Sequence, residues 1–229
     1  MVRCLELFSG THSVGKCCKE VGIETLSVDI DGRADINESI LDWDYKAYPK
    51  DSFDIIWASP PCATFSHLQY SNLGRMRHGK IFTEETRQEN MTQVGDPLVK
   101  KALEIIAYFE PELWFMENPK TGDLKTREYM KDIPFYDVSY CMYSDWGYRK
   151  HTRIWTNKQG WSPLMCDGKG TCGNMVGSLH KTNMGNTKRL KEAERRLRHR
   201  NEVSGIKKRT SLDDRYRVPP NLIYSLLLE

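Results

Sequence analysis

The 229-residue sequence contains no long hydrophobic run, no internal repeat and no low-complexity tract. A membrane-spanning helix needs roughly 18 or more consecutive apolar residues, and no apolar run reaches that length. The amino-terminal MVRCLELFSG also lacks the apolar stretch and cleavage site of a signal peptide, and we interpret it as a buried strand. We therefore expect an intracellular protein without a membrane partner.

The sequence also lacks a paired cysteine framework. Its seven cysteines are odd in number and scattered, which favours a reducing compartment over disulfides. Cys166, Cys172 and His180 follow one another at spacings of six and eight residues, which a small zinc site can use. No Cys-x-x-Cys pair accompanies them, and Cys141 or His151 would have to supply a fourth ligand. We therefore assign no metal, and plain structural cysteines remain the alternative to zinc.

Most of the chain lacks a large excess of either positive or negative charge. The formal net charge is +3, but residues 188–209 hold ten basic and three acidic residues, a net of +7. The remainder therefore sums to +3 − 7 = −4. A localised basic block indicates a polyanionic partner, with a solvated surface helix as the alternative.

Strand-like and helix-like segments alternate over residues 1–157, which predicts an α/β domain with a doubly wound, mostly parallel sheet. The expected strands are residues 2–8, 25–28, 53–58, 112–116, 135–142 and 153–156, and the expected helices are residues 14–21 and 97–109.

Three further segments depart from this alternation. Residues 66–95 are polar with little periodicity, which indicates a functional loop or a disordered insertion. Residues 158–215 are rich in Gly, Asn, Lys and Arg, and we expect a small basic lobe with a helix at about residues 187–202. Residues 216–229 are expected to return to the first domain as a helix.

Two sequence patterns mark the carboxyl ends of predicted strands. Leu7, Phe8, Ser9 and Gly10 lead from the first strand into a tight turn, and the second strand ends at Asp29, whose carboxylate can accept hydrogen bonds from a ribose. Alone, this signal does not distinguish a dinucleotide from S-adenosylmethionine.

Cys62 follows Pro60 and Pro61 directly after the strand at residues 53–58. A lone cysteine is more often a buried apolar residue than a nucleophile. However, Glu117 ends a second strand, which places a carboxylic acid at the same edge of the sheet.

LELFSG, VDID, SPPCATFS, MENP and WGYRKHTRIWTN occur in this order between residues 3 and 157. The series resembles the successive motifs of the cytosine C5-specific DNA methyltransferase family, and a weaker match returns at residues 216–228. The resemblance implies the class I S-adenosylmethionine-dependent methyltransferase fold, with S-adenosyl-L-methionine as cofactor and double-stranded DNA as partner. The compact lobe and the ENP variant resemble phage and large-virus members, so the cytoplasm or nucleus of a host cell is the expected compartment.

The resemblance assigns three catalytic residues. Cys62 inherits the thiolate that adds to C6 of a flipped-out cytosine, and Glu117 inherits the acid that acts at N3. Arg153 matches the arginine that holds O2. The family pattern Gln-x-Arg-x-Arg is altered here, with His151 in place of its first arginine.

The resemblance also implies cofactor and DNA contacts. The expected cofactor-binding residues are Phe8, Ser9, Gly10, Thr11, Asp29, Ile30, Ile40, Pro60 and Val218. The expected DNA-binding residues are Ser66, Arg75, Arg77, Lys150, Arg196 and Arg200. In the family the segment after Pro-Cys closes over DNA, and the lobe at residues 158–215 would read about two to four base pairs.

Two other functions fit the same motifs. A tRNA cytosine C5-methyltransferase is one, although the Cys-Phe-Thr tripeptide typical of that branch is missing. A catalytically impaired DNA-binding relative is the other, because the arginine motif and the last motif are altered. The family includes restriction–modification enzymes, but the sequence names no recognition site. We expect a monomer, with a homodimer as the alternative.

Overall fold

The computed structural model describes residues 1–77, 79–176, 179–182 and 210–229. The chain divides into two compact units. The first unit comprises Met1–Tyr136 and Thr152–Gly160, and the second comprises Asp137–His151 and Trp161–Glu229. This division differs from the expected boundaries at residues 157 and 215.

The difference arises from hydrogen bonds that join distant segments within the second unit. The backbone N–H of Ser139 donates to the carbonyl of Leu164 at 3.1 Å, and the Tyr148 hydroxyl donates to the carbonyl of Asp214. The segment 137–151 therefore groups with the carboxyl-terminal part of the chain. The expected return of residues 216–229 to the catalytic domain stays a prediction.

A seven-stranded sheet has the order β3-β2-β1-β4-β7-β9-β8. The pairs β1–β2, β2–β3, β1–β4 and β4–β7 are parallel, and β7–β9 is antiparallel. The predicted doubly wound, mostly parallel sheet is confirmed. The strands are β1 (Arg3–Leu7), β2 (Glu24–Asp29), β3 (Ile36–Asn37), β4 (Ile55–Ala58), β7 (Leu113–Pro119), β8 (Phe135–Ser139) and β9 (His151–Thr156). Two short hairpins are β5 (Met76–Arg77) with β6 (Lys80–Ile81), and β10 (Met175–Val176) with β11 (Leu179–His180).

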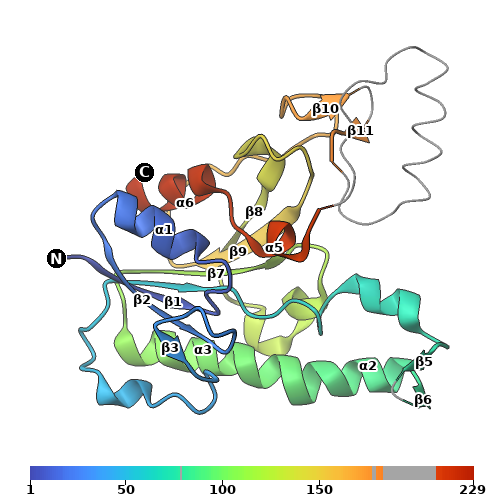
Figure 1. The fold of residues 1–229 in the computed structure, drawn as a ribbon, viewed down its shortest axis with the longest axis horizontal. Coiled ribbons are helices and arrows are strands. Elements are labelled where there is room, and N and C mark those ends of the chain that lie inside the picture. The colour runs from blue at the N-terminus through green and yellow to red at the C-terminus, as the bar shows by residue number, and fades with distance from the viewer. Residues whose placement is uncertain (78, 177–178, 183–209) are drawn as a thin grey trace. The chain divides into compact units, whose positions relative to one another are not determined.

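Helices cover both faces of the sheet in the first unit. Helix α1 (Ser13–Glu20) and helix α3 (Asp96–Phe109) lie on opposite sides of it (Figure 1). Strand β1 alternates accordingly: Leu5 and Leu7 join the core cluster that includes the buried face of α3, while Glu6 bonds the start of α1. The second unit contains α5 (Leu212–Tyr216) and α6 (Pro220–Leu228).

The segment 66–95 is more regular than its sequence predicted. It contains a 3-10 helix, His67–Asn72, then the β5–β6 hairpin, helix α2 (Glu84–Asn90) and a π-helical turn, Met91–Gly95, that leads into α3. The alternative of a disordered insertion is wrong for the described residues of this segment. Helix α2 has no apolar stripe because the buried residue on it is Arg87, so periodicity does not reveal it.

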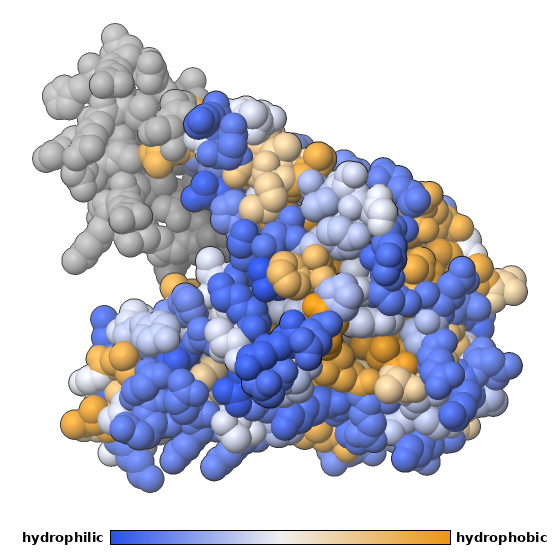
Figure 2. Space-filling model, turned by 180° about the vertical axis from the view of Figure 1, so that it is seen from behind, coloured by the Kyte–Doolittle hydropathy of each residue, from blue (hydrophilic) through white to orange (hydrophobic). Residues whose placement is uncertain are grey.

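The described helices include none that is both long and apolar enough to cross a membrane. Hydrophilic residues cover most of the face shown in Figure 2, with apolar residues in smaller groups between them. Single exposed apolar side chains such as Ile30 and Leu68 are normal on a protein surface. The predicted basic helix at about residues 187–202 lies outside the described residues.

Candidate active site

The carboxyl ends of β1, β4 and β7 meet at one edge of the sheet, because these strands are parallel neighbours. In the β4–β7 register Ala58 pairs with Met116, so the chain reaches Cys62 and Glu117 just beyond the last pair. The side chain of Asn118, fully buried, donates from Nδ2 to the carbonyl of Pro60 at 2.9 Å. This bond joins the Cys62 loop to the Glu117 strand.

The Cys62 loop is held from two further directions. The backbone N–H of Asp123 donates to the carbonyl of Phe65 at 2.8 Å. At Gly95, a Cβ would lie 2.5 Å from Thr64 Oγ1 and 2.6 Å from Phe65 Cζ, so only glycine fits against the loop. Gly95 is the last residue of a π-helical turn, and such turns often occur at functional sites. The Cys62 loop therefore contacts both the strand of Glu117 and the turn that leads into α3.

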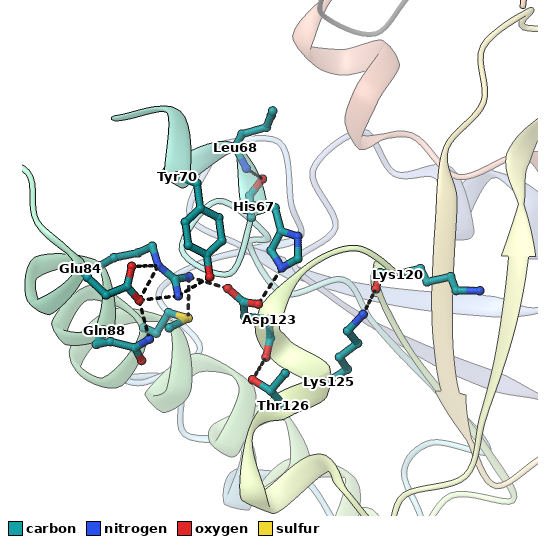
Figure 3. A network of polar contacts seen from close by, with 12 residues as sticks. His67, Leu68, Tyr70, Glu84, Gln88, Lys120, Asp123, Lys125 and Thr126 are labelled. Atoms are coloured by element: carbon teal, nitrogen blue, oxygen red, sulfur yellow. Dashed lines mark hydrogen bonds and ion pairs between the residues drawn. The ribbon is translucent and has the colours of Figure 1, made fainter. Parts of the chain in front are cut away.

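An ion-pair network centred on the buried Arg87 and Asp123 supports the same region (Figure 3). Arg87 is 3% exposed and bonds Asp123 at 2.5 Å and Glu84 at 2.7 Å, while its guanidinium lies 4.3 Å from the centre of the Tyr70 ring. His67 Nε2 lies 2.7 Å from the second oxygen of Asp123. The hydrogen bond to Glu84, followed by the interactions with Asp123, raises the pKa of Arg87 above its ordinary value. This network attaches the 3-10 helix and α2 to the segment after Glu117.

Arg153 lies on β9, whose antiparallel register pairs it with Asn118 and pairs Ile154 with Glu117. The structure thus brings Arg153 to the same end of the sheet as the expected acid. Its guanidinium carbon lies 3.5 Å from the centre of the Phe135 ring. When a planar guanidinium lies on the face of an aromatic ring, its N–H donors point outward from the rim of the guanidinium plane.

The loop after β1 has the backbone of a ligand-binding turn. Phe8 has a φ of +58° and Gly10 a φ of +46°, and non-glycine residues rarely adopt such angles outside strained or functional turns. Asp29 Oδ2 accepts a hydrogen bond from the N–H of Gly10 at 2.9 Å, and Oδ1 accepts from Ile30 N at 2.6 Å. The hydroxyl of Ser9 is buried and has no protein partner.

These features fit S-adenosylmethionine. A carboxylate has about four lone-pair positions, so Asp29 retains acceptor capacity for a ribose after its backbone bonds. The exposed side chain of Ile30, 76% accessible, is available to an adenine ring. The buried oxygens without a protein partner also include Thr64 Oγ1, in the loop after β4, and Asn118 Oδ1, near the carboxyl end of β7. Ligands bind α/β sheets at this edge.

The remaining expected cofactor residues differ in accessibility. Thr11 is half-buried, and its hydroxyl lies 2.9 Å from that of Ser13. Pro60 is buried, and its carbonyl accepts the hydrogen bond from Asn118. Ile40 is 4% exposed and belongs to the hydrophobic core, so little of its side chain remains for a ligand. Val218 is buried within the second unit, and its cofactor contact stays a prediction.

Glu6 is an unexpected titratable group beside this loop. It is 3% exposed, and its two oxygens accept hydrogen bonds from Val14 N at 3.1 Å and Gly15 N at 2.9 Å. Burial raises the pKa of Glu6 to about 7, although the two backbone donors oppose the shift. The carboxyl anchors the first turn of α1 to β1.

The expected DNA contacts are spread over both units. Ser66 caps the 3-10 helix by accepting from Leu68 N, and Arg75 and Arg77 are exposed at the β5–β6 hairpin. Arg77 donates to Asn72 at 2.7 Å. Lys150, in the second unit, donates to the carbonyl of Arg215 at 3.2 Å. Arg196 and Arg200 lie outside the described residues.

The structure brings the three zinc candidates of the second unit together and adds Cys141 to them. Burial, followed by its hydrogen bond to Cys166 and the nearby sulfurs, raises the pKa of the Cys141 thiol. Burial, followed by the charge of Arg149, lowers the pKa of His180.

Sequence reasoning did not identify the supporting residues Arg87, Asp123 and Gly95. Arg87 and Asp123 are 36 residues apart, and no local pattern connects them. Asn118 carried a signal, because it stands inside the MENP motif beside Glu117. Its role as the link to Pro60 emerges only from the folded chain.

No protein-family model matches the chain. A protein of Frog virus 3 (isolate Goorha), described as "Probable DNA (cytosine-5)-methyltransferase", is 42% identical over 228 residues, which cover 99% of each chain. Among solved structures, the Entamoeba histolytica methyltransferase EhMeth matches at a TM-score of 0.47 and 13% identity, over 72% of this chain and 56% of that one. The S. pombe Dnmt2 methyltransferase matches at 0.46 and 12% identity, over 86% of this chain and 66% of that one. The family of the chain is shown by the full-length relative at 42% identity.

Proposed function

Because the chain belongs to the DNA (cytosine-5)-methyltransferase family, we propose that it transfers a methyl group from S-adenosylmethionine to C5 of cytosine in double-stranded DNA. The observation that carries the proposal is the Asn118–Pro60 bond, which holds the loop of Cys62 against the strand end of Glu117. A nucleophile and an acid from neighbouring parallel strands are thereby fixed at one edge of the sheet.

The chemistry requires this pair of residues. C5 of cytosine is too weak a nucleophile to attack a sulfonium unaided. The Cys62 thiolate adds to C6, and a protonated Glu117 donates to N3 as negative charge builds on the ring. Arg153 is proposed to hold O2. The electron pair that the addition leaves on the ring makes C5 the nucleophile that takes the methyl group. Loss of the C5 proton to water then re-forms the C5–C6 double bond, breaks the C6–S bond to release the Cys62 thiolate, and returns the N3 proton to Glu117.

S-adenosylmethionine, when bound, supplies the methyl group as a sulfonium. Phe8, Ser9, Gly10 and Thr11 are proposed to surround its methionine end, and Asp29 its ribose. The target cytosine must leave the duplex to reach Cys62, which costs unstacking energy. The segment 66–95, with Arg75 and Arg77, is proposed to contact the phosphates, and the second unit to read a short recognition sequence. If the chain is viral, as its relative is, it would act on DNA inside a host cell.

The test is a covalent trap. DNA that contains 5-fluorocytosine should form a stable adduct with the wild-type chain and S-adenosylmethionine, because the C5 fluorine cannot leave as a proton does. Cys62→Ser and Cys62→Ala should form no adduct and methylate no DNA, yet keep their fold and cofactor affinity. An adduct with Cys62→Ala would refute the assignment of the nucleophile.

The same experiment separates the alternatives. A tRNA methyltransferase would form the adduct with 5-fluorocytosine-containing tRNA and not with DNA. A catalytically impaired relative would bind DNA and form no adduct with either. Bisulfite sequencing of DNA from cells that express the chain would then locate the modified cytosines.

A further inference from the structure

Four metal-binding side chains converge in the second unit. One sulfur each from Cys141, Cys166 and Cys172 and one ring nitrogen of His180 all lie within 4.8 Å of one another. His180 Nε2 lies 3.7 Å from the sulfur of Cys166 and 3.5 Å from that of Cys172. None of the seven cysteines forms a disulfide. We propose that these four residues bind one structural zinc ion.

The spacing of the atoms matches a tetrahedral centre. With Zn–S bonds of about 2.3 Å and Zn–N bonds of about 2.0–2.1 Å, ligand atoms in a tetrahedron lie about 3.8 Å (sulfur to sulfur) and about 3.6 Å (sulfur to nitrogen) apart. The two sulfur–nitrogen distances of 3.7 and 3.5 Å fall on that value. Three soft thiolates with one imidazole favour zinc over magnesium or calcium, which prefer oxygen ligands. Four protein ligands leave no open position, which is typical of a structural site.

The backbone between the ligands is shaped for this role. Gly168 and Gly170 have φ values of +75° and +102°, so the chain folds tightly between Cys166 and Cys172. The N–H of Gly168 donates to the sulfur of Cys166 at 3.4 Å, which would stabilise a thiolate there. The loop is tightened further by Asp167, which accepts from Lys169 N at 2.8 Å.

Two other elements bring in the remaining ligands. The β10–β11 hairpin returns the chain so that His180 pairs with Met175. Cys141 lies in the 3-10 helix Tyr140–Met142 and is 1% exposed. Asn174, also buried, joins the segments, since its Nδ2 lies 2.8 Å from the carbonyl oxygen of Cys141 and 3.1 Å from that of Cys172. Such outer contacts orient the ligands of metal sites.

A metal centre would add to the buried apolar contacts of the second unit, such as those of Val138, Leu222 and Ile223. The large hydrophobic core cluster consists of residues of the first unit, from Leu5 to Trp155. The described strands that belong wholly to the second unit, β10 and β11, have two residues each. Small units with limited cores commonly rely on a metal or a disulfide for stability. Zinc would join segments that are 39 residues apart in sequence, from Cys141 to His180.

The wild-type full-length chain provides the first test. Purified without chelators, it should contain about one zinc ion per chain, with three sulfurs at about 2.3 Å and one nitrogen at about 2.0–2.1 Å by X-ray absorption spectroscopy. Cobalt(II) exchanged into the site should give the visible absorption of a tetrahedral thiolate complex. A purified chain without zinc that also takes up neither zinc nor cobalt after reduction would overturn the proposal.

Matched variants provide the second test. Cys172→Ala should lower the zinc content at least about fivefold, whereas His180→Cys should keep it, because four cysteines also form zinc sites. Cys62→Ser, which changes a thiol of the first unit, should keep the full zinc content while it abolishes methyl transfer. Full zinc content in Cys172→Ala, or loss of zinc in Cys62→Ser, would contradict the assignment. Because zinc is measured directly, the result does not depend on the proposed enzymatic activity.

Discussion

At the scale of the single residue, the carboxylate of Asp29 accepts hydrogen bonds from the backbone of Gly10 and Ile30. It is also proposed to hold a ribose. Asp29→Ala should weaken S-adenosylmethionine binding by roughly tenfold or more, because hydrogen bonds to a charged group contribute about 1.5–3 kcal/mol. Titration calorimetry measures the change. Asp31→Ala is the matched control, because its carboxylate pairs with Arg33 at the surface and should leave affinity unchanged. Equal affinity in Asp29→Ala would move the ribose contact elsewhere.

Glu6 predicts a pH dependence of stability. Its pKa is raised from 4.5 to about 7 on folding, so the folded chain binds this proton more tightly than the unfolded chain. The contribution to stability is therefore complete below about pH 4.5 and is lost as the pH rises through about 7, by at most about 3 kcal/mol. Denaturant unfolding of wild type and Glu6→Gln from pH 4.5 to 8 should show the variant gaining relative stability. The control is Glu38→Gln at an exposed position, whose free energy of unfolding should follow that of the wild type across the pH range. If Glu6→Gln also followed the wild type, the predicted titration of the buried carboxyl would be wrong.

At the scale of elements, the Cys62 loop packs against Gly95, the last residue of the π-helical turn that joins α2 to α3. Gly95→Ala would place a methyl group against Thr64 and Phe65, so the loop or the helix must shift. A displacement of about 1 Å at a catalytic group can lower turnover about a hundredfold. We expect kcat to fall by about ten- to a hundredfold while S-adenosylmethionine affinity is kept.

Val94→Ala is the matched control, since Val94 is exposed in the same π-helical turn. Steady-state methylation and calorimetry measure both quantities. Wild-type kcat in Gly95→Ala would show that the packing of the Cys62 loop on the π-helical turn does not set the catalytic geometry.

At the scale of the whole molecule, charge is concentrated in one part of the sequence. Residues 188–200 contain seven Lys or Arg residues and two Glu residues. If they contact DNA phosphates, each contact releases counterions, so binding should weaken steeply with salt. Arg196→Ala and Arg200→Ala should each lower the slope of log affinity against log salt by about one and weaken cognate and scrambled duplexes alike.

Binding measured over a salt series on both duplexes tests this. A loss confined to the cognate duplex would identify a base contact instead, worth about 1–3 kcal/mol at one position. An unchanged slope would assign the phosphate contacts to the segment 66–95, where Arg75 and Arg77 are exposed.

The sequence by itself determined those features of this protein that depend on residues close together in the chain. Strand β4 is apolar throughout and β7 begins with four apolar residues, and the motifs around Cys62 and Glu117 follow these runs directly, so the sheet and the residues at its carboxyl edge could be predicted. The near-full-length relative confirms the family that those motifs indicated.

Only the tertiary structure decided how distant residues meet. Arg87 reaches Asp123 across 36 residues, Gly95 meets the Cys62 loop, and Cys141 joins Cys166, Cys172 and His180. Periodicity and motif spacing report only what neighbouring residues do. A buried arginine breaks the apolar pattern that would have revealed its helix, and the fourth zinc ligand comes from a segment that no local spacing connects to the other three.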